Sequence, residues 1–172
     1  MHPYYHPIDI ELSTEDWKFL NFLSHEYLSQ VKYPTFGDYE FPNYSHFFLR
    51  DAEADYSYHP IFKKLSDLFV ESPHSTVEHV YHWSQISTVP GTLPIHSDVR
   101  KAVISVPLVT FTSPITWHDE NDVELCRYHY DNTVTLINTE IRHGSLENES
   151  RRIFFQVGGF QEPFEKILTY LK

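Results

Sequence analysis

The sequence predicts a mainly β domain of the sandwich or barrel type, with helices before and after it. From about residue 75 to residue 160, short segments rich in Val, Ile, Thr, Phe and Tyr alternate with turn residues. This pattern is typical of antiparallel all-β folds rather than of βαβ units. The chain has 172 residues, of which 41% are apolar, so one domain can bury a core without disulfides.

The N-terminal part is expected to contain two helices and a long irregular stretch. Residues 12–30 open with a capping-box pattern, Ser13 and Asp16, and apolar residues then recur at helical spacing. Residues 60–72 have the character of a second helix with a proline in its first turn. The aromatic, proline-punctuated residues 33–60 show no clean periodicity, which favours irregular structure.

Six segments of the β body are predicted to be strands: residues 76–88, 102–109, 115–119, 122–130, 133–141 and 151–160. The tail, residues 162–172, is compatible with a closing helix. We therefore expect a single domain over residues 1–172, with a helical and loop flank at 1–74, the β body at 75–160 and a C-terminal helix at 161–172.

Charge and composition exclude several classes of function. With 13 Lys and Arg against 24 Asp and Glu, the formal net charge is −11, which argues against a nucleic-acid partner. No signal peptide and no apolar run of membrane-spanning length is visible in the sequence. The single cysteine, Cys126, excludes an intramolecular disulfide and suits a reducing compartment. We expect a cytoplasmic protein without a membrane or nucleic-acid partner.

The triplet His96-Ser97-Asp98 is a candidate half of a metal site. Residues i and i+2 of a strand point to the same face, so His96 and Asp98 could bind one cation together. Two histidines and one carboxylate with open coordination positions are typical of non-heme Fe(II) oxygenases. His143 lies 47 residues after His96, at the expected end of an apolar strand, and is the candidate third ligand.

A second triplet of the same type, His129-Tyr130-Asp131, lies only 14 residues before His143. That spacing corresponds to about one hairpin. We therefore expect only the first triplet to suit a ligand set drawn from opposite sides of a barrel. The alternative interpretation of either triplet is a solvated turn, and His143 alone could be a hydrogen-bonded histidine at a strand end. Arg100 could bind a substrate carboxylate or form a local salt bridge.

The motifs "HSD" and "RHGSLENESRR", in this order, resemble the Fe(II)- and 2-oxoglutarate-dependent oxygenases, near the small prolyl- and aspartyl/asparaginyl-hydroxylase-like branch. The resemblance covers roughly residues 75–160. It implies a double-stranded β-helix, that is, a jelly-roll or cupin-like fold, with N-terminal flanking helices and a short C-terminal helix. It also implies Fe(II), 2-oxoglutarate and O2 as cofactor and co-substrates, with release of succinate and CO2.

The same resemblance implies roles for individual residues. His96, Asp98 and His143 would hold Fe(II). An arginine shortly after the distal histidine would bind the far carboxylate of 2-oxoglutarate, because its planar fork pairs with both oxygens. Arg152, nine residues after His143, is the favoured candidate and Arg151 is the second.

Asn138, near the end of the preceding strand, could hydrogen-bond the bound acid, or it could be a buried amide satisfied by backbone. The implied reaction is hydroxylation of an amino-acid or peptidyl side chain, in a small molecule or a peptide. Two alternatives stay open. One is a cupin-like metalloenzyme that does not use 2-oxoglutarate. The other is a non-catalytic jelly-roll binding module whose histidines reflect composition alone.

Overall fold

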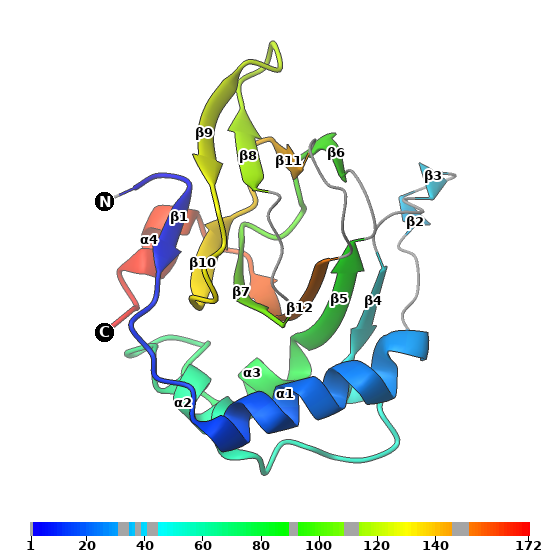
Figure 1. The fold of residues 1–172 in the computed structure, drawn as a ribbon. Coiled ribbons are helices and arrows are strands. Elements are labelled where there is room, and N and C mark those ends of the chain that lie inside the picture. Colours follow the sequence, from blue (N-terminus) through cyan, green and yellow to red (C-terminus); the bar gives the residue numbers. More distant parts are fainter. Residues whose placement is uncertain are drawn as a thin grey trace.

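In the computed structural model, the described part of the chain comprises residues 2–30, 35–36, 39–40, 45–89, 93–108, 114–145 and 152–172. Most of its strands form two antiparallel sheets, one of six strands and one of four (Figure 1). A separate two-stranded sheet is formed by β2 (Thr35–Phe36) and β3 (Tyr39–Glu40). The predicted fold class, a mainly β domain consistent with a double-stranded β-helix, is confirmed.

The six-stranded sheet has its longest strand near the middle. In spatial order it contains β1 (Tyr5–Pro7), β10 (Thr135–Asn138), β7 (Ala102–Pro107), β12 (Arg152–Phe160), β5 (Ser84–Val89) and β4 (Ser45–Phe48). Strand β12 pairs with β7 on one side and with β5 on the other. All of its residues except Gly159 are buried, as expected for a strand between two partners.

The two faces of this sheet have different neighbours because side chains alternate along each strand. Helices α1 (Thr14–Tyr27) and α2 (Pro60–Ser66) cover the outer face (Figure 1), where Ile104 and Phe155 belong to the main hydrophobic core. The rings of Phe62 in α2 and Phe155 in β12 lie 6.3 Å apart, centroid to centroid. The inner face carries Ser105 and Gln156, which line a cavity.

The four-stranded sheet supplies the opposite wall of that cavity. Its order is β6 (Leu93–His96), β11 (His143–Ser145), β8 (Ile115–His118) and β9 (Glu124–Tyr128). A second hydrophobic cluster joins the two sheets, with Trp117 and Ile115 from β8 and Val103 and Ile137 from the large sheet. The indole of Trp117 donates a hydrogen bond of 2.9 Å to the carbonyl oxygen of Asn138, which fixes the small sheet against β10.

The predicted N-terminal and C-terminal helices are both present. The Ser13 hydroxyl accepts from the Asp16 amide at 3.2 Å, and the Ser13 amide donates to the Asp16 carboxylate at 2.7 Å. This is the predicted capping box, and it starts α1 at Thr14. The expected C-terminal helix is α4 (Phe164–Leu168), which is shorter than the predicted residues 161–172. None of the described helices is long and apolar enough to cross a membrane.

Two predicted elements differ from the structure. Residues 76–88, predicted as one strand, begin with the short helix α3 (Val77–His82), and β5 starts only at Ser84. Thr76 explains the difference, because its hydroxyl accepts from the His79 amide at 3.1 Å and caps the helix. The second helix ends at Ser66 rather than near residue 72.

Six strands lie where none was predicted: β1, β2, β3, β4, β6 and β11. Strand β4 falls inside the stretch expected to be irregular, and β1 lies near the N-terminus. Each is completed by its partner, since β4 pairs with β5 and β1 pairs with β10. The 3-10 turns η1 (Leu28–Gln30) and η2 (Leu49–Asp51) follow α1 and β4. Pairing across the sheet, rather than the local pattern, therefore defines these short strands.

Candidate metal centre

His96 and His143 lie opposite each other on neighbouring strands. His96 ends β6 and His143 begins β11, and the antiparallel register pairs these two residues. Their ring centroids are 4.5 Å apart. The prediction that His143 ends a strand and that the ligands come from opposite sides of a barrel is therefore wrong. Four strands, β7 to β10, intervene in sequence but lead the chain back to the strand beside β6.

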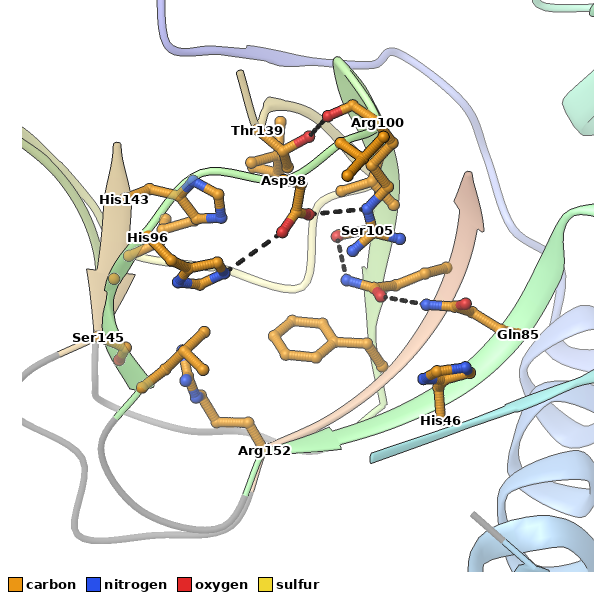
Figure 2. Close-up of a pocket in the computed structure, with 18 of the residues that line it drawn as sticks. His46, Gln85, His96, Asp98, Arg100, Ser105, Thr139, His143, Ser145 and Arg152 are labelled. Carbon is orange, nitrogen blue, oxygen red and sulfur yellow. Dashed lines mark hydrogen bonds and ion pairs between the residues drawn. The ribbon is translucent and has the colours of Figure 1, made fainter. Parts of the chain in front are cut away.

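Asp98 completes the cluster from the loop that follows β6. One potential ligand atom from each of His96, Asp98 and His143 lies within 4.8 Å of the others. The Asp98 carboxylate is 3.3 Å from His96 Nε2. The loop is fixed by Thr139, the residue after β10, because the Asp98 amide donates to the Thr139 carbonyl at 2.9 Å and the Thr139 hydroxyl donates to the Arg100 carbonyl at 2.8 Å. The backbone therefore holds Asp98 beside the two imidazoles (Figure 2).

Both histidines are oriented by backbone carbonyls. His96 Nδ1 lies 2.8 Å from the Pro94 carbonyl oxygen, and His143 Nδ1 lies 2.9 Å from that of Ile141. A carbonyl only accepts, so each Nδ1 carries a proton, and each Nε2 presents a lone pair when its imidazole is neutral. This second contact is typical of metal-ligating histidines. The three side chains thus fit a divalent cation of the first transition series.

The protonation states suit a cation as well. Burial lowers the pKa of His143 to about 4, so this imidazole is neutral at physiological pH. Burial alone would raise the pKa of Asp98, but Arg100 and the two histidines hold it well below its usual range. Burial alone would lower the pKa of His96, but its contact with Asp98 outweighs this and raises the pKa above the ordinary value.

Metal binding is therefore expected to release a proton when the pH is below the raised pKa of His96. His96 carries that proton in the free protein, and His143 and Asp98 carry none. Affinity should fall about tenfold per unit as the pH drops below the raised pKa of His96. Calorimetric titration with Fe(II) in buffers of different ionisation enthalpy measures the proton count. Release of no proton below that pKa would contradict the assignment.

Gly144 allows the two ligand strands to approach closely. A Cβ at this position would lie 3.0 Å from the carbonyl oxygen of Leu93 and 3.2 Å from Cα of Ile95, both backbone atoms of β6. Replacing Gly144 by alanine is expected to push β11 away from β6, at a cost of about 1–3 kcal/mol in stability. Because this separates the histidines, Fe(II) affinity should fall about tenfold. An unchanged affinity in a metal titration would contradict this account.

The cluster opens into a cavity of about 350 Å³ that both sheets line. Arg152, the first residue of β12, lies in this cavity with only 3% of its surface exposed. Its Nε and Nη2 atoms have no hydrogen-bond partner among the described residues. Burial lowers the pKa of this guanidinium. Two unpaired nitrogen atoms on a buried cation are unfavourable, so an anionic ligand at Arg152 would stabilise the site.

The other predicted site residues are placed differently. Arg151 lies outside the described residues. Asn138 does not line the cavity, because its amide donates to the Pro3 carbonyl at 2.8 Å and accepts from the Glu140 amide at 3.0 Å. We do not include Asn138 in the proposed co-substrate site. His129 and Asp131, the second triplet, are both exposed.

Sequence reasoning missed the wall that faces the metal centre. Gln85, Ser105 and Gln156 line the cavity from three adjacent strands. The available signal was the occurrence of polar side chains at alternate positions of otherwise apolar strands, which indicates a polar interior surface. His46 and Phe48 of β4 extend the same wall.

No family model matches the chain, and no curated protein matches its sequence significantly. Among solved structures, it is similar to EctD from S. alaskensis with bound Fe, at 13% identity and a TM-score of 0.53, over 91% of this chain and 72% of that one. The apo form of EctD aligns at 12% identity over the same shares, with a TM-score of 0.49. HygX from Streptomyces hygroscopicus, with nickel, 2-oxoglutarate and hygromycin B bound, aligns at 11% identity over 91% of this chain and 82% of that one, with a TM-score of 0.48. At 13% identity, the likeness to iron-bound EctD shows a shared fold.

Proposed function

We propose that the protein is an Fe(II)- and 2-oxoglutarate-dependent oxygenase that hydroxylates an amino-acid or peptidyl side chain and releases succinate and CO2. One observation carries the proposal. The His96, Asp98 and His143 cluster lines the same cavity as the buried guanidinium of Arg152. A divalent-metal site and an anion site in one cavity are what a metal-chelating dicarboxylate requires.

His96, Asp98 and His143 would hold the iron. Two neutral imidazoles and one ionised carboxylate leave open coordination positions, as in the two-histidine, one-carboxylate triads of non-heme iron oxygenases. With 2-oxoglutarate bound, the iron would activate O2, the oxidant, so that one oxygen atom enters a C–H bond of the substrate and the other enters succinate. The presence of Asp98 favours hydroxylation, since related halogenases lack this carboxylate.

Arg152 would bind the distal carboxylate of 2-oxoglutarate through its fork of N–H donors. Phe154, which lies on the same face of β12 as Arg152, contributes apolar lining to the cavity, as do Ile115 and Val103 from other strands. All three are buried. A charged hydrogen bond is stronger in such a buried site than at the surface.

The first test is an anaerobic titration of the apoprotein with Fe(II) and then with 2-oxoglutarate. We expect the weak visible charge-transfer band of the chelated keto acid, saturating at one equivalent. Tight metal binding without the band would favour the cupin-like metalloenzyme. Absence of stoichiometric metal binding would contradict both enzymatic assignments and favour a jelly-roll binding module.

A further inference from the structure

Arg100 lies beside the metal centre, on the far side of Asp98. One oxygen of Asp98 is 3.3 Å from His96 Nε2, and the other accepts a hydrogen bond of 2.9 Å from Arg100 Nε. A single carboxylate therefore separates the guanidinium from the metal position. Figure 2 shows Arg100 and Arg152 at opposite ends of the cavity. The cavity thus contains two separate positions for anions, one at Arg100 and one at Arg152. In the proposed function, 2-oxoglutarate occupies the position at Arg152.

The position of Arg100 is fixed by its packing on β12. Its Nη1 atom lies 3.5 Å, and its Cδ atom 3.8 Å, from where a Cβ on Gly158 would stand. These are ordinary contact distances, so the side chain lies along the backbone of the strand. Gly158 is two residues from Gln156, which also lines the cavity. The guanidinium is consequently held between the metal centre and the polar wall of the large sheet.

The charges in the cavity favour a substrate with one negative charge. Among the described lining residues, the charged side chains other than histidine are Asp98, Arg100 and Arg152. A divalent metal ion and dianionic 2-oxoglutarate added to these leave one positive charge uncompensated. An uncompensated charge in a partly buried cavity is unfavourable. An ammonium group on the substrate would add a second uncompensated positive charge. Among the described lining residues, the one carboxylate, Asp98, already contacts His96 and Arg100.

The wall across from the histidines is polar but uncharged. Gln156 pairs in register with Gln85 on one side and with Ser105 on the other. The Gln85 amide donates to Gln156 Oε1 at 2.9 Å, and the Gln156 amide donates to the Ser105 hydroxyl at 3.1 Å. Figure 2 shows Gln85 and Ser105 opposite His96. Such a wall suits neutral amide, hydroxyl or carbonyl groups.

From this arrangement we infer that Arg100 binds a carboxylate of the primary substrate. The substrate is then a small organic monoanion with a neutral polar group and no charged amine inside the cavity. An N-acylated amino acid or the carboxyl end of a peptide has this chemistry, whereas a free basic amino acid does not. The inference rests on the proposed function and specifies the substrate class of that site.

The test uses the full chain with Zn(II) in place of Fe(II) and saturating 2-oxoglutarate, in low-chloride buffer. Binding of N-acetyl amino acids, of their neutral amides and of the corresponding cationic amino-acid amides is measured by ligand-observed NMR. We expect the anions to bind best. In Arg100→Gln their affinity should fall about tenfold to a hundredfold, the range of a hydrogen bond to a charged group.

Lys101→Gln is the matched control, since it removes the same charge one residue away. Lys101 pairs with Glu140 and does not line the cavity, so anion affinity should be retained. Equal binding of anions, amides and cations, or no binding of any anion, would overturn the inference. It would also be overturned if metal or 2-oxoglutarate affinity fell as far as anion affinity in Arg100→Gln, because Arg100 would then only position Asp98.

The outcome also separates this inference from the proposed function. Failure of the wild-type protein to bind the metal or 2-oxoglutarate would contradict the proposed function. Binding of both without a preference for anions would contradict only the role of Arg100.

Discussion

Replacing Arg152 by methionine is expected to abolish 2-oxoglutarate binding and, at the same time, to stabilise the ligand-free protein. The guanidinium is buried, and two of its nitrogen atoms have no partner in the described part of the chain. Removing its charge-assisted hydrogen bonds to a carboxylate should weaken 2-oxoglutarate binding by about a hundredfold or more. Replacing a buried charge with an apolar side chain of similar length should raise the free energy of unfolding by about 1–4 kcal/mol.

Two measurements check this prediction. The anaerobic titration with Fe(II) and then 2-oxoglutarate measures co-substrate binding. Urea unfolding of the apoprotein measures its free energy of unfolding. Arg127→Met is the matched control, because Arg127 pairs with Glu124 on the partly exposed strand β9. Its effect on stability should stay within about 0.5 kcal/mol. A destabilised Arg152→Met protein, or one that retains the visible band, would show that Arg152 is a structural cation with an undescribed partner.

The second large effect is expected for His143→Ala, which should remove stoichiometric metal binding. His143 supplies one of three protein ligands. Loss of a residue that merely orients a ligand costs tenfold to a hundredfold in affinity, so loss of the ligand itself should exceed about a hundredfold. The imidazole is only 4% exposed, so truncation also leaves a small cavity, at about 1–3 kcal/mol.

Metal content after dialysis and the affinity for Fe(II) report this effect. His129→Ala is the control, because His129 belongs to the other His-x-Asp triplet and is exposed. That variant should bind Fe(II) as the wild-type protein does. Equal metal binding by both variants would exclude the proposed centre, and equal loss in both would indicate that metal binding is not confined to this cluster.

Several elements could be predicted from residues that are close together in the sequence. The capping box of Ser13 and Asp16 predicted the start of α1 because both partners lie within one turn. His96 and Asp98 could be paired because they lie two residues apart. Likewise, the apolar pattern of residues 102–107 predicted β7, whose six residues are all buried.

What could not be predicted depends on contacts between distant segments. His143 faces His96 through the register of β6 and β11, and no local pattern encodes a register between strands 47 residues apart. Strand β4 exists through its pairing with β5, although its own sequence resembles a loop. The neutral wall of Gln85, Ser105 and Gln156 could not be predicted, because it forms only when three strands lie side by side.

The two halves of the candidate site belong to different sheets. His96 and His143 belong to the four-stranded sheet, whereas Arg152 begins β12 of the six-stranded one. A dicarboxylate held by the metal at one end and by Arg152 at the other would cross-link the layers of the sandwich. Its binding free energy would then resist their separation, amounting to about 2.7 kcal/mol at a ligand concentration one hundred times the Kd. The bound co-substrate would thus stabilise the packing of the two sheets. The protein with metal and co-substrate bound would then unfold more cooperatively than the ligand-free protein.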